Sequence, residues 1–347
     1  MNWITLAQLQ EWLTGLMASH TVIAPTRVAA DLVLYQPVSA IDRIVFDNPR
    51  VPISPKEFFL PATEALMTIE RVRQVSAGGD PTWKVKITET HMARDQVLFG
   101  LHPCDVHALS VLDALLLKPP VDTYYAERRE RTTLIGMACE EMGPACFCTS
   151  LGLSPDDGDG MDIVLHRRDD RYLLDARTDK GQALVAGLHL IPAPETVAPR
   201  DWTAEFPVPV RDAWQARFDD AQWAQVADRC LNCKICAYVC PTCRCFDIRD
   251  EVVAQKPGYQ EIERLRCWDA CTVDNYRRIA GGHNPRPTKM QRLRNRFYCK
   301  FDYYPADFGP VACVGCGRCI DLCPVNVDIT EILGMVAARS HAQEVKA

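Results

Sequence analysis

Two stretches near the C-terminus of this chain share one cysteine pattern: residues 230–241 read CLNCKICAYVCP, and residues 313–324 read CVGCGRCIDLCP. Both fit Cys-x₂-Cys-x₂-Cys-x₃-Cys-Pro without a gap, a spacing that ligates cubane iron–sulfur clusters. Three thiolates two residues apart on a tight loop reach three corners of one cube. The fourth cysteine is expected to begin a helix that points away, with proline in its first turn. Zinc, the alternative metal, favours separate Cys-x₂-Cys pairs, so the pattern predicts two [4Fe–4S] clusters.

The two runs are expected to exchange ligands. In bacterial two-cluster ferredoxins, the fourth cysteine of each run binds the cluster of the other run. Crossed ligation then gives one cluster on Cys230, Cys233, Cys236 and Cys323, and a second cluster on Cys313, Cys316, Cys319 and Cys240. The 72 residues from 241 to 312 that separate the runs are interpreted as an insertion in such a domain.

The composition narrows the class of protein. The chain has 347 residues, 48% of them hydrophobic, and a net charge of −6, which suits two or three folded domains and argues against a nucleic-acid binder. Its first residues lack the pattern of a signal peptide, and no apolar run reaches the roughly 18 residues that span a membrane. The 17 cysteines are therefore expected to be reduced thiols in the cytoplasm, available to bind metal.

Cysteine usage also divides the chain, because only four of its cysteines precede residue 225. We expect an α+β protein with a mixed α/β domain over residues 1–190. A linker that ends in a helix follows over residues 191–224, and a helical ferredoxin-like domain fills residues 225–347. The local patterns predict buried strands at 96–101 and 132–137, a helix over 106–117 capped by Asp105, and a helix over 214–230.

The four N-terminal cysteines predict a third site. If the strands 96–101 and 132–137 are parallel neighbours, Cys104 and Cys139 meet at the carboxyl edge of the sheet, where α/β folds place their sites. A Cys-x-Cys pair, Cys146 and Cys148, follows on a polar loop. We expect these four thiols to hold a third [4Fe–4S] cluster, with zinc as the second option and plain burial of small side chains as the alternative. The neighbouring His102 and His107 are weaker candidates as ligands.

The insertion contains further motifs, and their order resembles one protein family. Residues 240–246 read CPTCRCF, 268–271 read WDAC, 280–284 read AGGHN, and 292–300 read RLRNRFYCK. With the second cysteine run, this order resembles the β-subunits of cytoplasmic NAD(P)-linked [NiFe] hydrogenases (sulfhydrogenases) and the corresponding iron–sulfur subunit of anaerobic sulfite reductase. The segments 54–61 (SPKEFFLP), 103–105 (PCD) and 146–149 (CFCT) agree, so the resemblance spans nearly the whole chain. Cys267 departs from the family pattern, which has arginine there.

The resemblance implies an electron-transfer subunit of a multisubunit oxidoreductase in anaerobic metabolism. Its partners would be a flavoprotein subunit with FAD and an NAD(P) site, and a catalytic redox subunit. A [NiFe] hydrogenase module is favoured by the AGGHN and RLRNR segments. The alternatives are a complex of the anaerobic sulfite reductase type and a related heterodisulfide-reductase-like complex. We expect no catalytic residue in the chain itself.

The remaining residues of the insertion leave alternatives open. Its thiols Cys243, Cys245, Cys267 and Cys271 either ligate a further metal or pack near the first cluster, and Cys299 is expected to be structural. His283 either donates a hydrogen bond to a cluster sulfide or, as we favour, fixes a glycine turn. Residues 275–300 hold basic side chains and no carboxylate, which would offset cluster charge or dock an acidic partner. These basic residues are Arg277, Arg278, Arg286, Lys289, Arg292, Arg294, Arg296 and Lys300.

Two other classes of function compete with an electron relay. No Gly-x-Gly-x-x-Gly segment follows a strand and no P-loop occurs, so nothing predicts a nucleotide or flavin site in this chain. A self-contained enzyme would bind substrate at the insertion thiols or at an open iron of the N-terminal cluster. A zinc scaffold for assembly would lack the brown absorbance of iron–sulfur clusters.

Overall fold

A computed structural model describes residues 1–338 except 75–79, 195–196, 198–199, 204 and 277. Its largest sheet has eight strands in the order β10-β1-β9-β8-β7-β6-β2-β3. The strands β2, β6, β7 and β8 run parallel to one another at its centre, which confirms the expected parallel pair. The bounds are β1 (Asn2–Thr5), β2 (Thr21–Ala29), β3 (Leu32–Pro37), β6 (Gln96–Leu101), β7 (Thr132–Met137), β8 (Ile163–Arg168), β9 (Arg171–Ala176) and β10 (Ile191–Pro192).

Helices cover both faces of this sheet and enclose two hydrophobic cores. The helices α1 (Leu6–Ser19) and α4 (Asp179–Val185) close the core around Leu13 and Phe99, whereas α2 (Pro103–Leu116) and α3 (Thr123–Glu130) close the other core. Helix α2 begins three residues earlier than predicted, and its N-cap is His102. Asp105 lies at the third helical position, where its carboxylate accepts the His102 N–H at 3.3 Å. The prediction that Asp105 is the N-cap was therefore wrong, because Asp105 lies inside the first turn of the helix.

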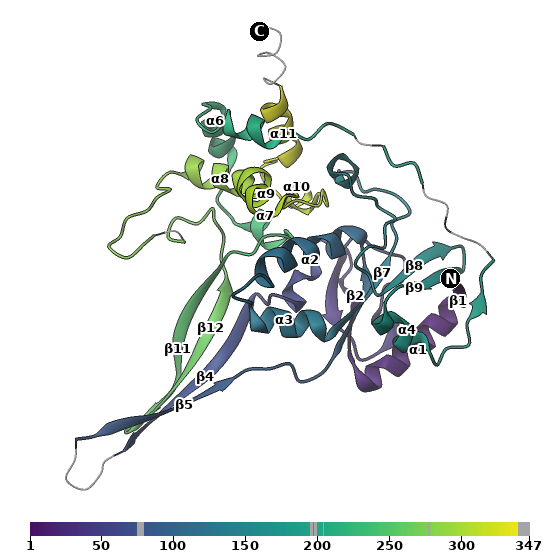
Figure 1. The fold of residues 1–347 in the computed structure, drawn as a ribbon, viewed down its shortest axis with the longest axis horizontal. Helices are drawn as coiled ribbons and strands as arrows, with labels where there is room; N and C mark the ends of the chain where they lie inside the picture. Colours follow the sequence, from purple (N-terminus) through teal and green to yellow (C-terminus); the bar gives the residue numbers. More distant parts are fainter. Residues whose placement is uncertain (75–79, 195–196, 198–199, 204, 277, 339–347) are drawn as a thin grey trace.

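A second sheet of four strands projects from the body as an arm (Figure 1). The hairpin of β11 (Phe246–Lys256) and β12 (Tyr259–Trp268) comes from the insertion, and it pairs with β4 (Thr63–Gln74) and β5 (Thr82–Glu89) from the N-terminal part. The insertion was not expected to form strands. This pairing ties the N-terminal part of the chain to the cysteine-rich part through one continuous sheet.

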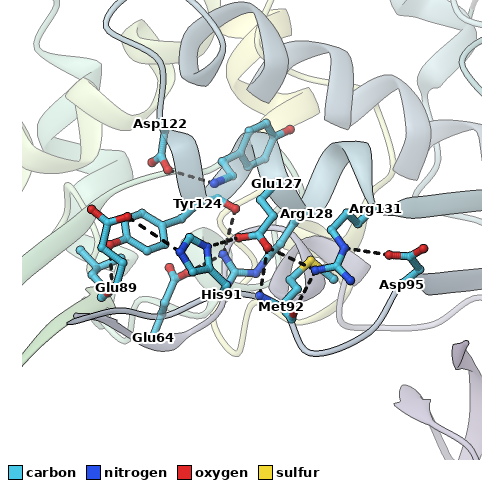
Figure 2. A network of polar contacts seen from close by, with 12 residues as sticks. Glu64, Glu89, His91, Met92, Asp95, Asp122, Tyr124, Glu127, Arg128 and Arg131 are labelled. Carbon is cyan, nitrogen blue, oxygen red and sulfur yellow. Dashed lines mark hydrogen bonds and ion pairs between the residues drawn. The ribbon is translucent and has the colours of Figure 1, made fainter. Parts of the chain in front are cut away.

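A polar network fixes the base of the arm to helix α3 (Figure 2). Buried Glu64 pairs with Arg128 of α3 and with Arg266 of β12, which lies 2.6 Å from it. Glu127 accepts hydrogen bonds from Met92 N–H at 3.1 Å and from Arg131, which also binds Asp95 at 2.7 Å. Removing one partner of the buried Glu64–Arg266 pair would leave an uncompensated charge in the interior, which is strongly destabilising.

The C-terminal part is a compact group of helices. Helix α6 begins at Gln222, whose N–H donates to the Asp220 carboxylate at 2.9 Å. The single helix predicted over 214–230 is therefore wrong, because the structure has two helices there. The aromatic core includes Trp214 and Phe301, stacked with ring centroids 4.9 Å apart. The helices are α5 (Arg211–Gln215), α6 (Gln222–Arg229), α7 (Ile235–Tyr238), α8 (Lys289–Tyr298), α9 (Tyr304–Phe308), α10 (Arg318–Asp321) and α11 (Ile329–Ala337). Within the described residues, no helix is long and apolar enough to cross a membrane.

Candidate iron–sulfur sites

Both cysteine runs fold into the same loop. Each has two residues with positive φ on either side of its second cysteine: Asn232 and Lys234 in the first run, Gly315 and Gly317 in the second. The third cysteine then lies in a short helix, α7 or α10, and the fourth follows that helix. A helix that begins at the fourth cysteine was therefore wrongly predicted. The fourth thiol is instead displaced by the length of the short helix, which carries it away from the other three.

The first cavity contains thiols from both runs. Cys230, Cys233 and Cys236 line it together with Cys323, the fourth cysteine of the second run. The Cys230 sulfur accepts the Asn232 N–H at 3.3 Å, and the Cys323 sulfur accepts the Val327 N–H at 3.2 Å. Backbone N–H groups aimed at ligand sulfurs are typical of iron–sulfur loops. The structure thus brings together the four thiols that crossed ligation requires.

A second cavity contains the complementary set of thiols, Cys240, Cys313, Cys316 and Cys319. Burial raises the pKa of Cys313 to about 11 and that of Cys319 to about 12. Cys240 behaves differently, because a hydrogen bond with Cys243 and the charges of Lys300 and Arg296 lower its pKa well below the ordinary value. A thiolate is the form that binds metal, so the positive charges beside Cys240 favour that form.

The four N-terminal cysteines also converge. Cys104 in the first turn of α2 and Cys139 after β7 lie at the carboxyl edge of the parallel strands, and Cys146 and Cys148 line the same cavity of about 370 Å³. Burial raises the pKa of Cys139 to about 12 and that of Cys148 to about 11. Cys148 is buried and the other three are half-buried. Four such thiols without a partner would leave poor hydrogen-bond donors facing one another, whereas a metal deprotonates coordinating thiols and uses all four.

The two histidines near this cavity have other partners. The His102 ring lies between the Cys139 sulfur, 3.3 Å from Nδ1, and the Pro49 carbonyl, 3.2 Å from Nε2. Burial lowers the pKa of His102. The His107 Nε2 lies 3.3 Å from an Asp157 carboxylate oxygen. His102 is therefore placed to orient Cys139 rather than to replace it.

The N-terminal cavity adjoins the second cavity. Cys316 lines both, and the Phe147 N–H donates to the Gly315 carbonyl at 2.8 Å. A Cβ at Gly315 would collide with the Cys148 backbone, and a Cβ at Gly317 would collide with the Ala145 carbonyl. Only glycine allows both the positive φ and this close approach of two cysteine loops.

A buried ion pair links the same two regions. Arg318 of the second run lies 2.6 Å from the carboxylate of Asp105, and both side chains are almost fully buried. No role was predicted for Arg318 from the sequence. The signal was available, since each residue adjoins a cysteine predicted as a ligand, Asp105 following Cys104 and Arg318 preceding Cys319.

Of the insertion thiols, Cys243 is placed next to the second cavity by its contact with Cys240. Cys243 is hydrogen-bonded to Cys240, and Cys271 to Cys245, which raises the pKa of both Cys243 and Cys271. Cys267 lies in β12, where it pairs with Asp247. Among the residues that the structure describes, no three histidine, cysteine or acidic side chains come close enough to hold a single metal ion. A further metal at Cys243, Cys245, Cys267 and Cys271 stays a prediction.

The family-like segment 54–61 packs against these thiols. Lys56 is almost fully buried, its Nζ donates to the Cys243 carbonyl at 2.9 Å, and it lies 3.9 Å from the centre of the Trp268 ring. His283, in contrast, is exposed, and its carbonyl accepts the Ile279 N–H at 2.9 Å within a turn. This bond is made by the main chain, so the turn-forming role of the His283 side chain stays a prediction.

The basic residues of 275–300 divide into surface and interior groups; Arg277 lies outside the described residues. Arg292 is buried and pairs with Asp274 at 2.6 Å. Arg296 lines both cavities of the dicluster region and is 3% exposed. Lys300 is equally buried and donates to the Cys240 sulfur at 3.3 Å. The stretch is therefore not a continuous surface patch, and part of its charge faces the cysteine cavities.

Comparisons with known proteins agree with this arrangement. A family model described as a 4Fe-4S dicluster domain matches residues 229–327. The β-subunit of sulfhydrogenase 2 from Pyrococcus furiosus is 32% identical over 315 residues, which cover 87% of this chain and 88% of that protein. No solved structure matches the chain. With a 4Fe–4S dicluster domain at its C-terminal end and this identity along most of its length, the chain belongs to the family of sulfhydrogenase β-subunits.

Proposed function

We propose that this chain relays electrons through [4Fe–4S] clusters within a cytoplasmic multisubunit hydrogenase complex. The observation that carries the proposal is the contiguity of three thiol-lined cavities. Cys319 lines both the first and the second cavity, and Cys316 lines both the second and the N-terminal cavity. When bound, each cluster accepts and returns one electron. Neighbouring clusters that share a loop of backbone would form a continuous route through the chain.

The two C-terminal cavities suit anionic clusters. We assign Cys230, Cys233, Cys236 and Cys323 to one cluster, and Cys313, Cys316, Cys319 and Cys240 to the other. Arg296 lies between the two cavities, and its Nε has no hydrogen-bond partner although the side chain is buried. Its Nη2 donates to the Cys236 carbonyl at 3.0 Å, but a buried N–H of a charged group that has no acceptor is costly. A cluster with four thiolates carries net negative charge and would supply the missing partner.

The N-terminal cavity would hold a third cluster on Cys104, Cys139, Cys146 and Cys148. Anaerobic purification followed by iron analysis tests this assignment. We expect about twelve irons per chain, and about eight in Cys104→Ala, because each cubane holds four. The matched control is Cys299→Ala, which removes a thiol that lines none of the three cavities and should leave the iron content unchanged. About eight irons in the native chain, unaltered by Cys104→Ala, would exclude the third cluster.

We infer a flavoprotein subunit with FAD and an NAD(P) site as one neighbour, and a [NiFe] hydrogenase module as the other. The name of the matched relative, one subunit of a sulfhydrogenase, supports a hydrogenase complex, and the flavoprotein neighbour rests on the sequence resemblance. Purification of the tagged chain from its own cells, without oxygen, identifies the partners. Recovery of hydrogenase subunits supports the proposal. Recovery of a sulfite-reducing subunit or of heterodisulfide-reductase-like subunits would transfer the chain to one of those complexes.

One observation favours a second candidate, a self-contained reductase. The N-terminal cavity, at about 370 Å³, falls within the size range of small-molecule sites, so it has room for a small acceptor beside a metal centre. Isolated chain that reduces sulfite or polysulfide without any partner would support this candidate. Isolated chain that exchanges electrons only with dyes or with a co-purified flavoprotein would support the relay.

A further inference from the structure

The second cavity contains an ammonium group whose contacts are fully defined. Lys300 Nζ has three partners: the Cys240 sulfur at 3.3 Å, Thr242 Oγ1 at 2.7 Å and the Ala312 carbonyl at 3.0 Å. An ammonium has three N–H donors, so these contacts use all of them. None of the three partners is a carboxylate. The charge of Lys300 is therefore buried, held in place, and directed at a sulfur.

The position of this ammonium is fixed by a neighbouring hydroxyl. Thr242 is fully buried, and its Oγ1 donates to the Ala312 carbonyl at 2.8 Å, which leaves its oxygen lone pairs to accept from Lys300. Lys300 Nζ is thus surrounded by three acceptors, the number that the charged ammonium form can serve.

Among the residues described, the first cavity has no fully buried lysine bonded to a ligand sulfur. Backbone hydrogen bonds do not distinguish the two cavities, because each has two: Asn232 and Val327 donate in the first, and Gly315 and Arg318 donate to Cys313 and Cys316 in the second. Arg296 lines both cavities and therefore acts on both. Lys234 lies within the first run and lines the first cavity, but it is only half-buried. Lys289 has its Nζ 3.2 Å from the Cys230 carbonyl rather than from a sulfur.

We propose that Lys300 is a positioning residue that raises the reduction potential of the cluster bound at Cys240, Cys313, Cys316 and Cys319. That cluster would then be reduced more readily than the cluster of the first cavity. Reduction adds one negative charge to the cluster, and a buried positive charge beside a ligand sulfur stabilises the reduced form. The low dielectric of the interior strengthens that effect, whereas solvent and salt screen Lys289. This inference rests on the proposed function, because it requires a cluster in the second cavity.

The test is an EPR-monitored titration of the anaerobic protein with dithionite and dye mediators. In Lys300→Met, we expect one cluster to become at least about tenfold harder to reduce at a fixed potential, a shift of about 59 mV per tenfold for a one-electron couple. The other clusters should not move. Lys300→Gln, which keeps an N–H donor but loses the charge, should give most of the same shift. The control Lys289→Met should leave every midpoint within about threefold of the native value.

A second, milder variant keeps Lys300 but removes one of its hydrogen-bond partners. Thr242→Val removes the hydroxyl that holds Lys300 and should lower the same midpoint by a smaller amount, and it decides the matter if Lys300→Met fails to retain its cluster. Native midpoints in both Lys300→Gln and Thr242→Val, with all clusters present, would overturn the inference while leaving the relay intact. Absence of cluster EPR signals and iron from the native chain would instead overturn the proposed function.

Discussion

The two cysteine runs have the same spacing and the same backbone, but their surroundings differ. In the first run, Leu231 and Cys233 are exposed, and Asn232 and Lys234 occupy the positive-φ positions. In the second run, glycines occupy those positions, and the loop is covered by the Cys146–Cys148 segment. One loop faces outward and the other faces the N-terminal part of the chain.

This difference indicates which end of the proposed relay lies at the surface and which end lies in the interior. The outward loop would present a first cluster to a partner at the surface, whereas the inward loop would place a second cluster beside the N-terminal cavity. The residues that distinguish the second loop are those that contact the N-terminal part of the chain. Gly315 and Gly317 allow its close approach, and Arg318 pairs with Asp105. The equivalent of Arg318 in the first run is Ile235, which lines the first cavity.

The largest expected effect comes from the ion pair between the inward loop and the N-terminal part of the chain. Arg318→Leu leaves the Asp105 carboxylate buried without its partner, and we expect a loss of about 3–5 kcal/mol in stability. The matched change in the outward loop, Ile235→Leu, should cost less than about 1.5 kcal/mol. Anaerobic thermal melting measures both. A double variant, Arg318→Leu with Asp105→Asn, should recover part of the loss, and a single variant as stable as Ile235→Leu would contradict a structural role for the pair.

A smaller effect is expected from the glycines. Gly317→Ala forces a Cβ into the Ala145 carbonyl at a positive φ, and we expect a cost of about 1–3 kcal/mol together with separation of the two loops. Lys234→Gly, at the same position of the outward loop, removes a strained side chain and should be close to neutral. Melting temperatures of both variants test the contrast. Equal costs would mean that the two loops are not differently packed.

The smallest effect is a difference in the rate of metal loss. Cys233 is the exposed cysteine of the described set, whereas the thiols of the second cavity are half-buried or buried. During slow oxidation in the presence of a chelator, the cluster of the first run should be lost before that of the second. The order of disappearance of the EPR signals, assigned with the Cys233→Ala variant, checks this. Simultaneous loss would indicate that both loops are equally open.

The sites were easier to predict from the sequence than the connections between them. Spacing alone placed Cys323 with Cys230, because a local rule governs ligand loops, and the α+β class is confirmed. Strand ends placed Cys104 near Cys139, because parallel neighbours end at one edge. The pairing of β12 with β4, which includes the Arg266–Glu64 ion pair, was not predicted, since it joins segments about two hundred residues apart. An ion pair between two single residues, such as Asp105 and Arg318, leaves no repeating pattern in the sequence from which it could be predicted.

The central claim is that the second-run cluster lies between two others. EPR of the fully reduced native chain tests it, because unpaired electrons on adjacent clusters broaden and split each other's signals. We predict a coupled spectrum in which Cys139→Ala, by removing the N-terminal cluster, abolishes one part of the coupling and leaves the interaction between the two C-terminal clusters. A native spectrum that is a simple sum of isolated signals, or one that Cys139→Ala does not change, would contradict the account.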